Sequence, residues 1–212
     1  MKQITAIIPQ QRQAGRVNIY LDDAFAFGLA AILAARLKVG QMITPEIIAD
    51  LQTQDEYEKA RETALHLISL RPRSIAEITQ HLRTKGVPTD VTAQVVSYLQ
   101  EISLLDDEAF ARYWLEQRET FRPRSSLALR QELQQKGISR AVIQALLSEV
   151  DESATARRAA AAKARQLAHL PEEAFRLKLG HFLQQRGFTY DIMQEVITDL
   201  WQEIVANKDS GY

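Results

Sequence analysis

A block of residues recurs along this chain at a spacing of about fifty positions. The segment Arg71–Ser74 reads Arg-Pro-Arg-Ser, and the same four residues return 51 positions later as Arg122–Ser125. The pair Lys85-Gly86 returns 51 positions later as Lys136-Gly137, and then 50 positions later as Arg186-Gly187. Self-similarity at a fixed period is the signature of stacked supersecondary units. The period therefore predicts an extended surface suited to a long partner, and it disfavours a deep catalytic pocket.

The apolar positions of each copy keep the same register. Helical spacing of this kind predicts one buried face on each helix. Before the glycines, the corresponding positions are Ile78 and Leu82, then Leu129 and Leu133, then Leu179 and Leu183. After the glycines they are Val87, Val91, Val95 and Leu99, then Ile138, Val142, Leu146 and Val150, then Phe188, Ile192, Val196 and Leu200.

Each copy contains the signals of three helices. In the first, a helix over residues 55–70 ends before Pro72, and Ser74 with Glu77 forms the capping-box pattern of the next helix. That helix is expected to stop at Gly86, where a left-handed residue favours glycine, and a third helix follows over residues 90–103. The second copy repeats the plan, with caps at Asp106 or Asp107, Ser125 and Ser139. The third copy changes its first helix, an alanine-rich segment over residues 154–168, and replaces the Arg-Pro-Arg-Ser block with Pro171-Glu172-Glu173.

The first 54 residues lie outside the repeat. Residues 4–8 and 17–21 alternate in polarity and predict a β-hairpin with a long turn, followed by a second turn at Asp22-Asp23. Residues 24–27 are candidates for a third short strand. A helix is expected over residues 29–37, closing near Gly40, and another begins at Thr44-Pro45, where Thr caps and Pro suits the first helical position.

The predicted fold is mainly α-helical, with three tandem three-helix repeats in a curved array after a small N-terminal β-hairpin and short-helix module. The predicted divisions are the module at 1–54, the repeats at 55–105, 106–150 and 151–205, and a frayed tail at 206–212. Each repeat alone is small, so neighbouring repeats must stabilise one another.

Composition narrows the function classes. The chain has 26 basic and 27 acidic residues and a net charge of -1, so its overall charge gives no support for strong nonspecific DNA binding. It has no cysteine, which excludes disulfides and thiol chemistry and fits a reducing cytosol. The four histidines lack metal-ligand spacing, and no glycine-rich phosphate loop or nucleophile motif occurs. We therefore expect no enzyme activity, no metal and no cofactor, no signal peptide or membrane span, and a cytoplasmic location.

The two Arg-Pro-Arg turns carry the sharpest local chemistry. Proline stiffens each turn, and the guanidinium groups of Arg71, Arg73, Arg122 and Arg124 can each bind phosphate or carboxylate bidentately near a helix start. One interpretation is a row of partner contacts, with one pair of arginines in each repeat. The alternative, about equally supported, is that these arginines pair with acidic residues of an adjacent repeat.

Further basic residues lie close to these turns in the sequence. A solvated face of mixed charge is the favoured interpretation for most of them. Helical spacing similarly favours the core, over a base-stacking role, for the aromatic residues of the helix that begins near Asp106. The further binding candidates are Arg83, Lys85, Arg112, Arg118, Arg130 and Lys136.

Several blocks resemble the RecX family of bacterial recombination regulators. They are Arg71–Ser74, Leu82–Gly86, Leu104–Ala111, Leu129–Leu133 and Lys136–Ile138, and the block Leu-Leu-Asp-Asp-Glu-Ala-Phe-Ala is the most specific. The likeness covers residues 55–205, and the N-terminal hairpin resembles an extension found in some members. Because the third repeat lacks both turn arginines, a third equivalent contact is in doubt.

The resemblance implies a protein that regulates RecA in recombination, DNA repair and the SOS response. Members are built from tandem three-helix units, bind in the groove of the RecA–DNA filament, and lower strand exchange, ATP hydrolysis and co-protease activity without catalytic residues. A basic surface facing the filament would include Arg71, Arg73, Arg122 and Arg124. We expect a monomer that contacts the RecA filament, with at most weak direct contact to DNA.

Two other functions stay open. Three-helix units resemble helix-turn-helix domains, so the chain could bind DNA directly without RecA. It could also be a helical-repeat scaffold for an unrelated protein.

Overall fold

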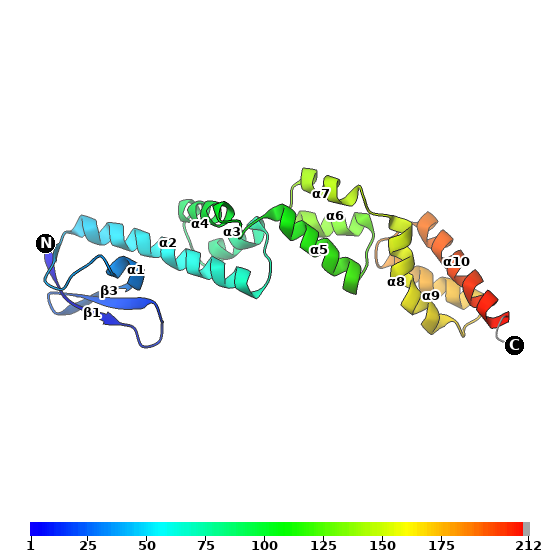
Figure 1. Cartoon of the computed structure of the whole chain (residues 1–212), viewed down its shortest axis with the longest axis horizontal. Helices are drawn as coiled ribbons and strands as arrows, with labels where there is room; N and C mark the ends of the chain where they lie inside the picture. The colour runs from blue at the N-terminus through cyan, green and yellow to red at the C-terminus, as the bar shows by residue number, and fades with distance from the viewer. Residues whose placement is uncertain (210–212) are drawn as a thin grey trace. The chain divides into compact units, whose positions relative to one another are not determined.

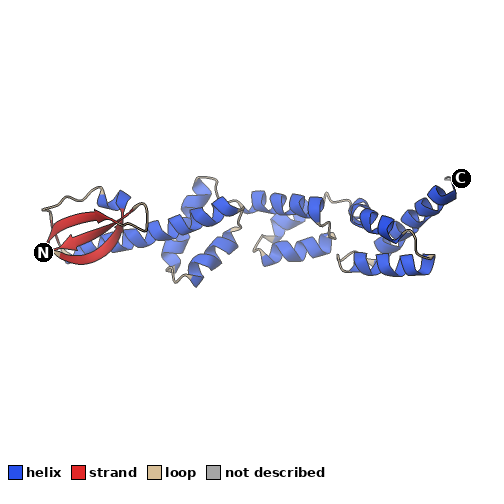
Figure 2. Ribbon diagram, turned by 90° about the horizontal axis from the view of Figure 1, so that it is seen from below, coloured by secondary structure: helices blue, strands red, loops and turns tan. Residues whose placement is uncertain are grey.

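The computed structural model describes residues 1–209, and the chain divides into two units between Leu105 and Asp106. The first unit contains four strands and four helices, and the second contains six helices among its described residues (Figure 1). Strands occur only in the N-terminal part of the described chain (Figure 2). The predicted fold class is thus confirmed, while the predicted curvature of the array stays a prediction.

The predicted hairpin is part of a four-stranded antiparallel sheet. Its strands are β1 (Lys2–Pro9), β2 (Arg16–Leu21), β3 (Ala24–Ala30) and β4 (Met42–Ile43), in the order β3-β2-β1-β4. The turn from β2 to β3 has two residues, Asp22 and Asp23, with φ angles of 49° and 64°. Positive φ at both positions matches the twist of the flanking strands, which explains a tight hairpin here. Strand β4 has only two residues, too few to leave a periodic signal in the sequence.

Strand β3 runs further than residues 24–27, and the helix predicted over residues 29–37 shrinks to α1 (Ala31–Ala34). Leu29 pairs with Val17 of β2 and is fully buried in the core of the module. Burial of Leu29 within the sheet therefore outweighs the helix propensity of the alanine-rich segment, which is a common way for tertiary packing to override local preference.

A single helix, α2 (Pro45–Leu70), replaces two predicted helices. Its start is as predicted, because the Thr44 side chain accepts a hydrogen bond from the Ile47 backbone N–H. The predicted helix start at Asp55 is wrong, and the predicted limit between residues 54 and 55 falls inside α2. No proline or glycine interrupts residues 46–70, so nothing in the backbone requires a break.

Asp55 joins α2 to the sheet. Its buried carboxylate accepts hydrogen bonds of 2.8 Å from the Arg16 guanidinium on β2 and from the Ala30 backbone N–H. The Lys59 ammonium group lies 2.8 Å from the same carboxylate. Burial by itself raises the pKa of Asp55, but these hydrogen bonds outweigh it, so the pKa lies below its ordinary value. One helix therefore belongs to the module at its start and to the first repeat at its end.

The remaining helices form the three-helix repeats. The first repeat combines the end of α2 with α3 and α4, the second contains α5 to α7, and the third contains α8 to α10. Helix α10 continues to Asp209, through the first four residues of the predicted frayed tail, whose fraying stays a prediction, and residues 210–212 lie outside the described part. The bounds are α3 (Ile75–Thr84), α4 (Thr89–Glu101), α5 (Asp107–Phe121), α6 (Ser126–Gln135), α7 (Arg140–Leu147), α8 (Glu152–Leu167), α9 (Glu172–Gln184) and α10 (Tyr190–Asp209).

The predicted serine caps at helix starts and the predicted glycine stops at helix ends are both confirmed. Ser74 accepts a hydrogen bond from the Glu77 backbone N–H, and Ser125 does the same from Ala128. The three glycines that end the second helices, Gly86, Gly137 and Gly187, have φ between 80° and 86°. This left-handed conformation is nearly free for glycine and costly for other residues, which explains why the signal recurs.

Each repeat and the module have a separate small core. The predicted positions before the glycines, in the three copies from Ile78 to Leu183, are all buried. In α7 the most buried residues are Ile143 and Leu147, whereas the predicted Val142 and Leu146 are only partly buried. Neighbouring residues lie about 100° apart around a helix, so both pairs border the inward face and the sequence cannot choose between them.

The second and third repeats meet through two turns. The Ser125 backbone N–H, at the turn between α5 and α6, donates a 3.1 Å hydrogen bond to the Arg186 carbonyl, at the turn between α9 and α10. Gly187 lies against the same serine, so closely that a Cβ there would be 2.7 Å from the Ser125 Oγ. The absence of a side chain at residue 187 therefore permits this contact.

We predict that Asp55→Asn lowers the free energy of unfolding by about 3–5 kcal/mol at pH 7, because it leaves the Arg16 charge buried and unpaired. Since the folded pKa of Asp55 is depressed, its contribution is complete above the ordinary aspartate pKa and is lost as the pH falls through the folded pKa. Urea unfolding should therefore show a difference from wild type that is large at pH 7 and narrows in acid. Asp50→Asn, an exposed change on the same helix, should change stability by less than about 0.5 kcal/mol. Equal effects of the two variants at pH 7 would contradict the assignment.

We also predict that Gly187→Ala destabilises the protein more than Gly86→Ala. Both glycines are left-handed, which costs roughly 1 kcal/mol for alanine. A Cβ at Gly86 meets nothing within 4 Å, whereas one at Gly187 collides with Ser125. Thermal unfolding of the two variants separates the cost of the φ angle from the cost of the contact between repeats. Equal shifts of the melting temperature would show that the two turns do not need this close approach.

Candidate interaction site on the arginine turns

The two arginines of the second repeat occupy different environments. Arg122 is exposed and, within residues 1–209, has no ion-pair partner. Arg124 is half-buried, and its guanidinium lies 2.9 Å from the Glu132 carboxylate on α6. Proline at position 123 restricts the backbone between them. The Arg124 guanidinium is held by the protein, and Arg122 is exposed to solvent.

Glu132 is the centre of a cluster that brings three predicted residues together. Its carboxylate accepts hydrogen bonds from Trp114 Nε1 at 2.8 Å and from Arg118 Nε at 2.7 Å, besides its ion pair with Arg124. The Arg118 guanidinium and the Lys136 ammonium lie 4.7 Å and 5.0 Å from the Trp114 ring centre. Arg118, Arg124 and Lys136 therefore form an internal network, in which cation–π contacts add to the ion pairs.

In the first repeat, the first arginine of the turn is the one that is paired with a glutamate. Arg71 makes two hydrogen bonds to the Glu77 carboxylate, at 3.0 and 3.2 Å, and one to the Pro72 carbonyl. Arg73 donates only a 3.4 Å hydrogen bond to the Leu67 carbonyl and has no ion-pair partner in the described part of the chain. In both repeats the glutamate comes from the same repeat, so pairing with an adjacent repeat does not account for Arg71 or Arg124.

The difference between the two turns, in which a different arginine is paired, has a simple origin in the sequence. The second repeat has alanine, Ala128, 51 positions after Glu77, and the first has histidine, His81, 51 positions before Glu132. The first repeat can therefore neutralise only Arg71, and the second only Arg124. Each turn has one arginine for which the described side chains provide no carboxylate, namely Arg73 and Arg122.

The third repeat contributes a cation that was not among the predicted candidates. Arg186 occupies the position of Lys85 and Lys136 in the earlier copies, and this correspondence was the available signal. The contact between the two turns brings it beside Arg122 and Arg124. Burial, and then the positive charges of those two arginines, lower the pKa of Arg186. We call Arg122, Arg124 and Arg186 the arginine junction.

Two donors of the arginine junction lack acceptors. The Nε atoms of Arg124 and Arg186 are buried, and no hydrogen-bond partner for them is present among the described residues. The Arg186 guanidinium lies 3.8 Å from the Phe182 ring centre, which holds it in place by a cation–π contact. A guanidinium held in this way keeps the remaining N–H groups for an anion.

The remaining candidates are dispersed. Arg83 and Lys85 are exposed at the end of α3. Arg112 pairs with Glu108 one turn earlier on α5, at 2.7 Å, and Arg130 donates a 3.3 Å hydrogen bond to the Gln144 side chain. Exposed pairs of this kind contribute little to stability. A mixed-charge surface accounts for these four residues.

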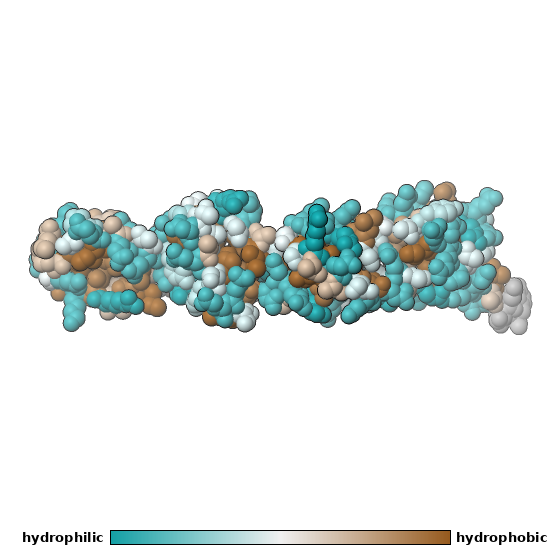
Figure 3. Space-filling model, turned by 90° about the horizontal axis from the view of Figure 1, so that it is seen from above, coloured by the Kyte–Doolittle hydropathy of each residue, from teal (hydrophilic) through white to brown (hydrophobic). Residues whose placement is uncertain are grey.

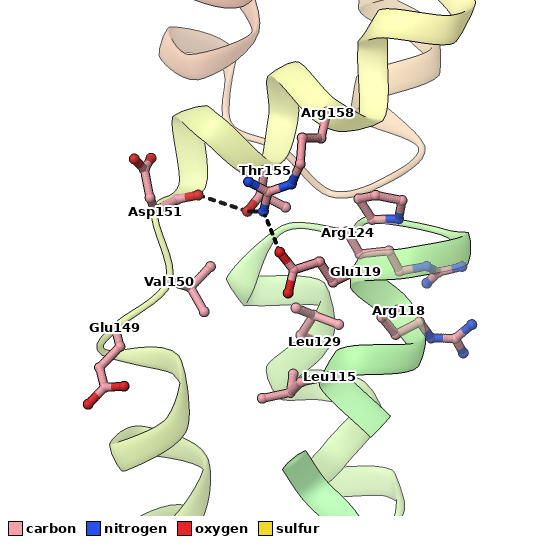
Figure 4. A pocket seen from close by; sticks show the side chains of 11 residues that line it. Leu115, Arg118, Glu119, Arg124, Leu129, Glu149, Val150, Asp151, Thr155 and Arg158 are labelled. Carbon is pink, nitrogen blue, oxygen red and sulfur yellow. Dashed lines mark hydrogen bonds and ion pairs between the residues drawn. The ribbon is translucent and has the colours of Figure 1, made fainter. Parts of the chain in front are cut away.

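A cavity of about 240 Å³ opens beside the junction, between α5 and α8 (Figure 4). Arg158 extends from α8 and donates hydrogen bonds to Glu119 of α5, at 2.9 Å, and to Thr155, at 3.0 Å (Figure 4). Arg118 and Arg124 also border the cavity. The charged side chains that border it thus include four that are held in ion pairs, Arg118 and Arg124 with Glu132, and Arg158 with Glu119.

The described residues contain no group of three histidine, aspartate or glutamate side chains placed to hold a metal. No helix among residues 1–209 is long and apolar enough to cross a membrane. On the face drawn in Figure 3, hydrophilic residues cover most of each unit and hydrophobic residues form small patches. The exposed Arg122 and the Arg186 guanidinium, which lies against the Phe182 ring, are suited to binding an anionic partner.

Family comparisons cover nearly the whole chain. The RecX N-terminal domain matches residues 2–44, and the first, second and third RecX three-helix domains match residues 60–99, 106–147 and 150–197. The Regulatory protein RecX of Clostridium botulinum (strain Eklund 17B / Type B) is 29% identical over 206 residues, covering 94% of this chain and 96% of that protein. The Regulatory protein RecX of Leuconostoc citreum (strain KM20) is 30% identical over 207 residues, covering 94% of this chain and 77% of that protein.

Solved structures agree with these matches. A crystal structure of regulatory protein RecX superposes with a TM-score of 0.69 at 27% identity, covering 94% of this chain and all of that chain. The structure of RecX from Lactobacillus salivarius gives a TM-score of 0.59 at 22% identity, covering 69% of this chain and 97% of that one, which supports the fold alone. Four consecutive domain matches and a 30% identical relative together confirm the resemblance: this chain belongs to the RecX family of regulatory proteins.

Proposed function

We propose that this protein is a non-enzymatic regulator that binds the RecA–DNA filament and lowers its strand exchange, ATP hydrolysis and co-protease activity. Membership of a family of regulatory proteins supports the regulatory part. The observation that supports filament binding is the Arg-Pro-Arg turn of the first two repeats, in which one arginine of each turn has no carboxylate partner in the described part of the chain. A filament is itself a repeating partner, and a repeated contact matches it in kind. Recombination and repair occur in the cytoplasm, which is the location that this proposal requires.

Because a different arginine is paired in each turn, each turn arginine can be assigned either to filament contact or to a structural role. Arg73 and Arg122 contact the filament, and Arg71 and Arg124 hold their own turns through Glu77 and Glu132. Arg118 and Lys136 support the second turn through Trp114 and Glu132. Arg83, Lys85, Arg112 and Arg130 are exposed or weakly paired, and they contribute to the surrounding charge rather than to a fixed contact.

The filament proposal predicts inhibition of RecA ATPase activity on single-stranded DNA as this protein is titrated in. Because a protein that caps or breaks a filament affects many RecA subunits, inhibition should be evident well below one copy per RecA. A coupled ATPase assay measures this directly, and strand exchange should fall over the same range of concentrations. An unchanged ATPase rate at equimolar protein would exclude the proposal.

The assignment of the arginines predicts opposite results for two double variants. Arg73→Glu with Arg122→Glu should raise the concentration needed for half-inhibition of the RecA ATPase roughly tenfold or more, because charge-assisted contacts are lost. Their melting temperature should be close to that of wild type, since neither arginine has an ion-pair partner within residues 1–209.

The matched control exchanges the other arginine of each turn. Arg71→Gln with Arg124→Gln should lower the free energy of unfolding by about 1–3 kcal/mol, mostly through Arg124, because the Arg71 pair is more exposed. It should inhibit the ATPase almost normally at temperatures where it is folded. If the control loses inhibition and the Arg73/Arg122 variant keeps it, the assignment of roles is reversed.

A further inference from the structure

We propose that a groove between α5 and α8 of the second unit binds the phosphate group of a nucleotide, either within a single nucleic-acid strand or in a free nucleotide. The groove has a volume of about 460 Å³, a size suited to a small ligand. Its charged lining residues are Glu119, Arg158, Lys163 and Arg186, and its aromatic lining residues are Phe121 and Phe182. The proposal does not depend on RecA, and it is tested without it.

The charge of the groove is unbalanced. Three cations from two elements, Arg158 and Lys163 on α8 and Arg186 before α10, face one carboxylate, Glu119. Arg122 and Arg124 add their positive charges at Arg186. Among the side chains that the structure describes, neither Lys163 nor Arg186 has a carboxylate partner. A cluster of like charges of this kind is relieved by an anion with several acceptor oxygens.

Phosphate suits the groove better than a carboxylate does. A terminal phosphate group offers more acceptor oxygens than a carboxylate, and a strand presents a phosphodiester at each successive nucleotide, so donors from several side chains can bind together. The Arg186 side chain lines this groove, and its buried Nε has no acceptor among the described residues, so no other group engages that donor. The guanidinium of Arg186 is already held against the Phe182 ring, so little mobility is lost when it binds.

The aromatic lining extends the ligand beyond phosphate. Phe121 ends α5 with 77% of its surface exposed, which is unusual for a phenylalanine that serves only the core. Basic grooves with exposed aromatic side chains bind nucleotides by holding the phosphate and stacking the base. A phosphate at Lys163 and Arg186 would leave the attached base beside Phe121. This combination favours a nucleotide unit over an acidic peptide, which has no base to stack.

Glu119 acts as an internal competitor for the groove. Its carboxylate lies 2.9 Å from the Arg158 guanidinium, and the two side chains are 61% and 50% exposed. An ion pair this exposed is weak, so a phosphate can replace the carboxylate at Arg158 at little cost. Removing the negative charge of Glu119 should therefore strengthen binding, whereas removing a cation should weaken it.

The test is fluorescence anisotropy of a labelled oligothymidylate titrated with the full chain, at low salt and without RecA. Lys163→Gln and Arg186→Gln should each weaken binding roughly tenfold, and Glu119→Gln should strengthen it about two- to fivefold. Arg165→Gln removes the same charge from the exposed surface of α8, outside the groove, and should leave the affinity within about twofold of wild type. Melting temperatures identify any variant that is not folded, and Lys163→Gln, on the helix surface, provides the reading if Arg186→Gln unfolds.

Competition separates the sources of the phosphate. Displacement of the oligonucleotide by thymidine monophosphate as well as by unlabelled strand would indicate a site for one nucleotide, and displacement by the strand alone would indicate a site for a nucleic-acid segment. Displacement by an acidic peptide but not by either nucleotide would overturn the proposal. So would equal affinities for wild type, Lys163→Gln and Glu119→Gln. Because no RecA is present, these results are independent of whether the protein inhibits RecA.

Discussion

The backbone hydrogen bond from Ser125 to the Arg186 carbonyl is the contact on which the second unit depends. It joins the start of one repeat's second helix to the end of the next repeat's second helix, with Gly187 fitted against the serine. Ser125 also caps α6, so one buried residue ends a loop, starts a helix and meets the next repeat. Small cores cannot tolerate a displaced turn, because each repeat buries only a few large side chains.

The same contact creates the electrostatics of the site. It places Arg186 beside Arg122 and Arg124, and among the described residues only Arg124 is paired with a glutamate of its own repeat. A contact made by backbone atoms thus determines which side chains meet, although none of those side chains makes the contact. The first unit uses a different device at its own joint, where a buried Asp55 ties α2 to Arg16 and Ala30. A buried carboxylate of this kind is stable only with all its donors present, which makes the joint specific as well as strong.

The parts of the fold that follow from short-range rules could be predicted from the sequence. Ser74, Ser125 and the glycines at 86, 137 and 187 act within one turn of the helix they begin or end, so their signals are local. Prediction from the sequence fails where the local structure depends on a residue that is distant in the chain. From the sequence, Asp55 is expected at the start of a helix, but in the structure its carboxylate lies within α2 and is bound by Arg16 and Ala30. Leu29 is likewise expected in a helix, but it pairs with Val17 in the sheet.

The candidate site could likewise be predicted from the sequence only in part. The repetition of Arg-Pro-Arg identifies both turns from the sequence, but nothing in the sequence says which arginine a glutamate will hold. Glu77 lies six residues after Arg71, and Glu132 lies eight residues after Arg124, so the two turns use different spacings for the same purpose. Arg122 and Arg124 lie beside Arg186 because of the way two repeats pack. The repeat period could therefore indicate Arg186 itself but not its neighbours.

Local placement of charge matters more for this chain than its net charge of -1. At physiological ionic strength, charges are screened over about 8 Å, so a partner senses the groups near its own contact and little beyond. At the arginine junction that neighbourhood contains three guanidinium groups, and the nearest carboxylate, Glu132, is already engaged by Trp114, Arg118 and Arg124. A nearly neutral protein can therefore present a strongly positive site, because its carboxylates are committed to holding the turns in place.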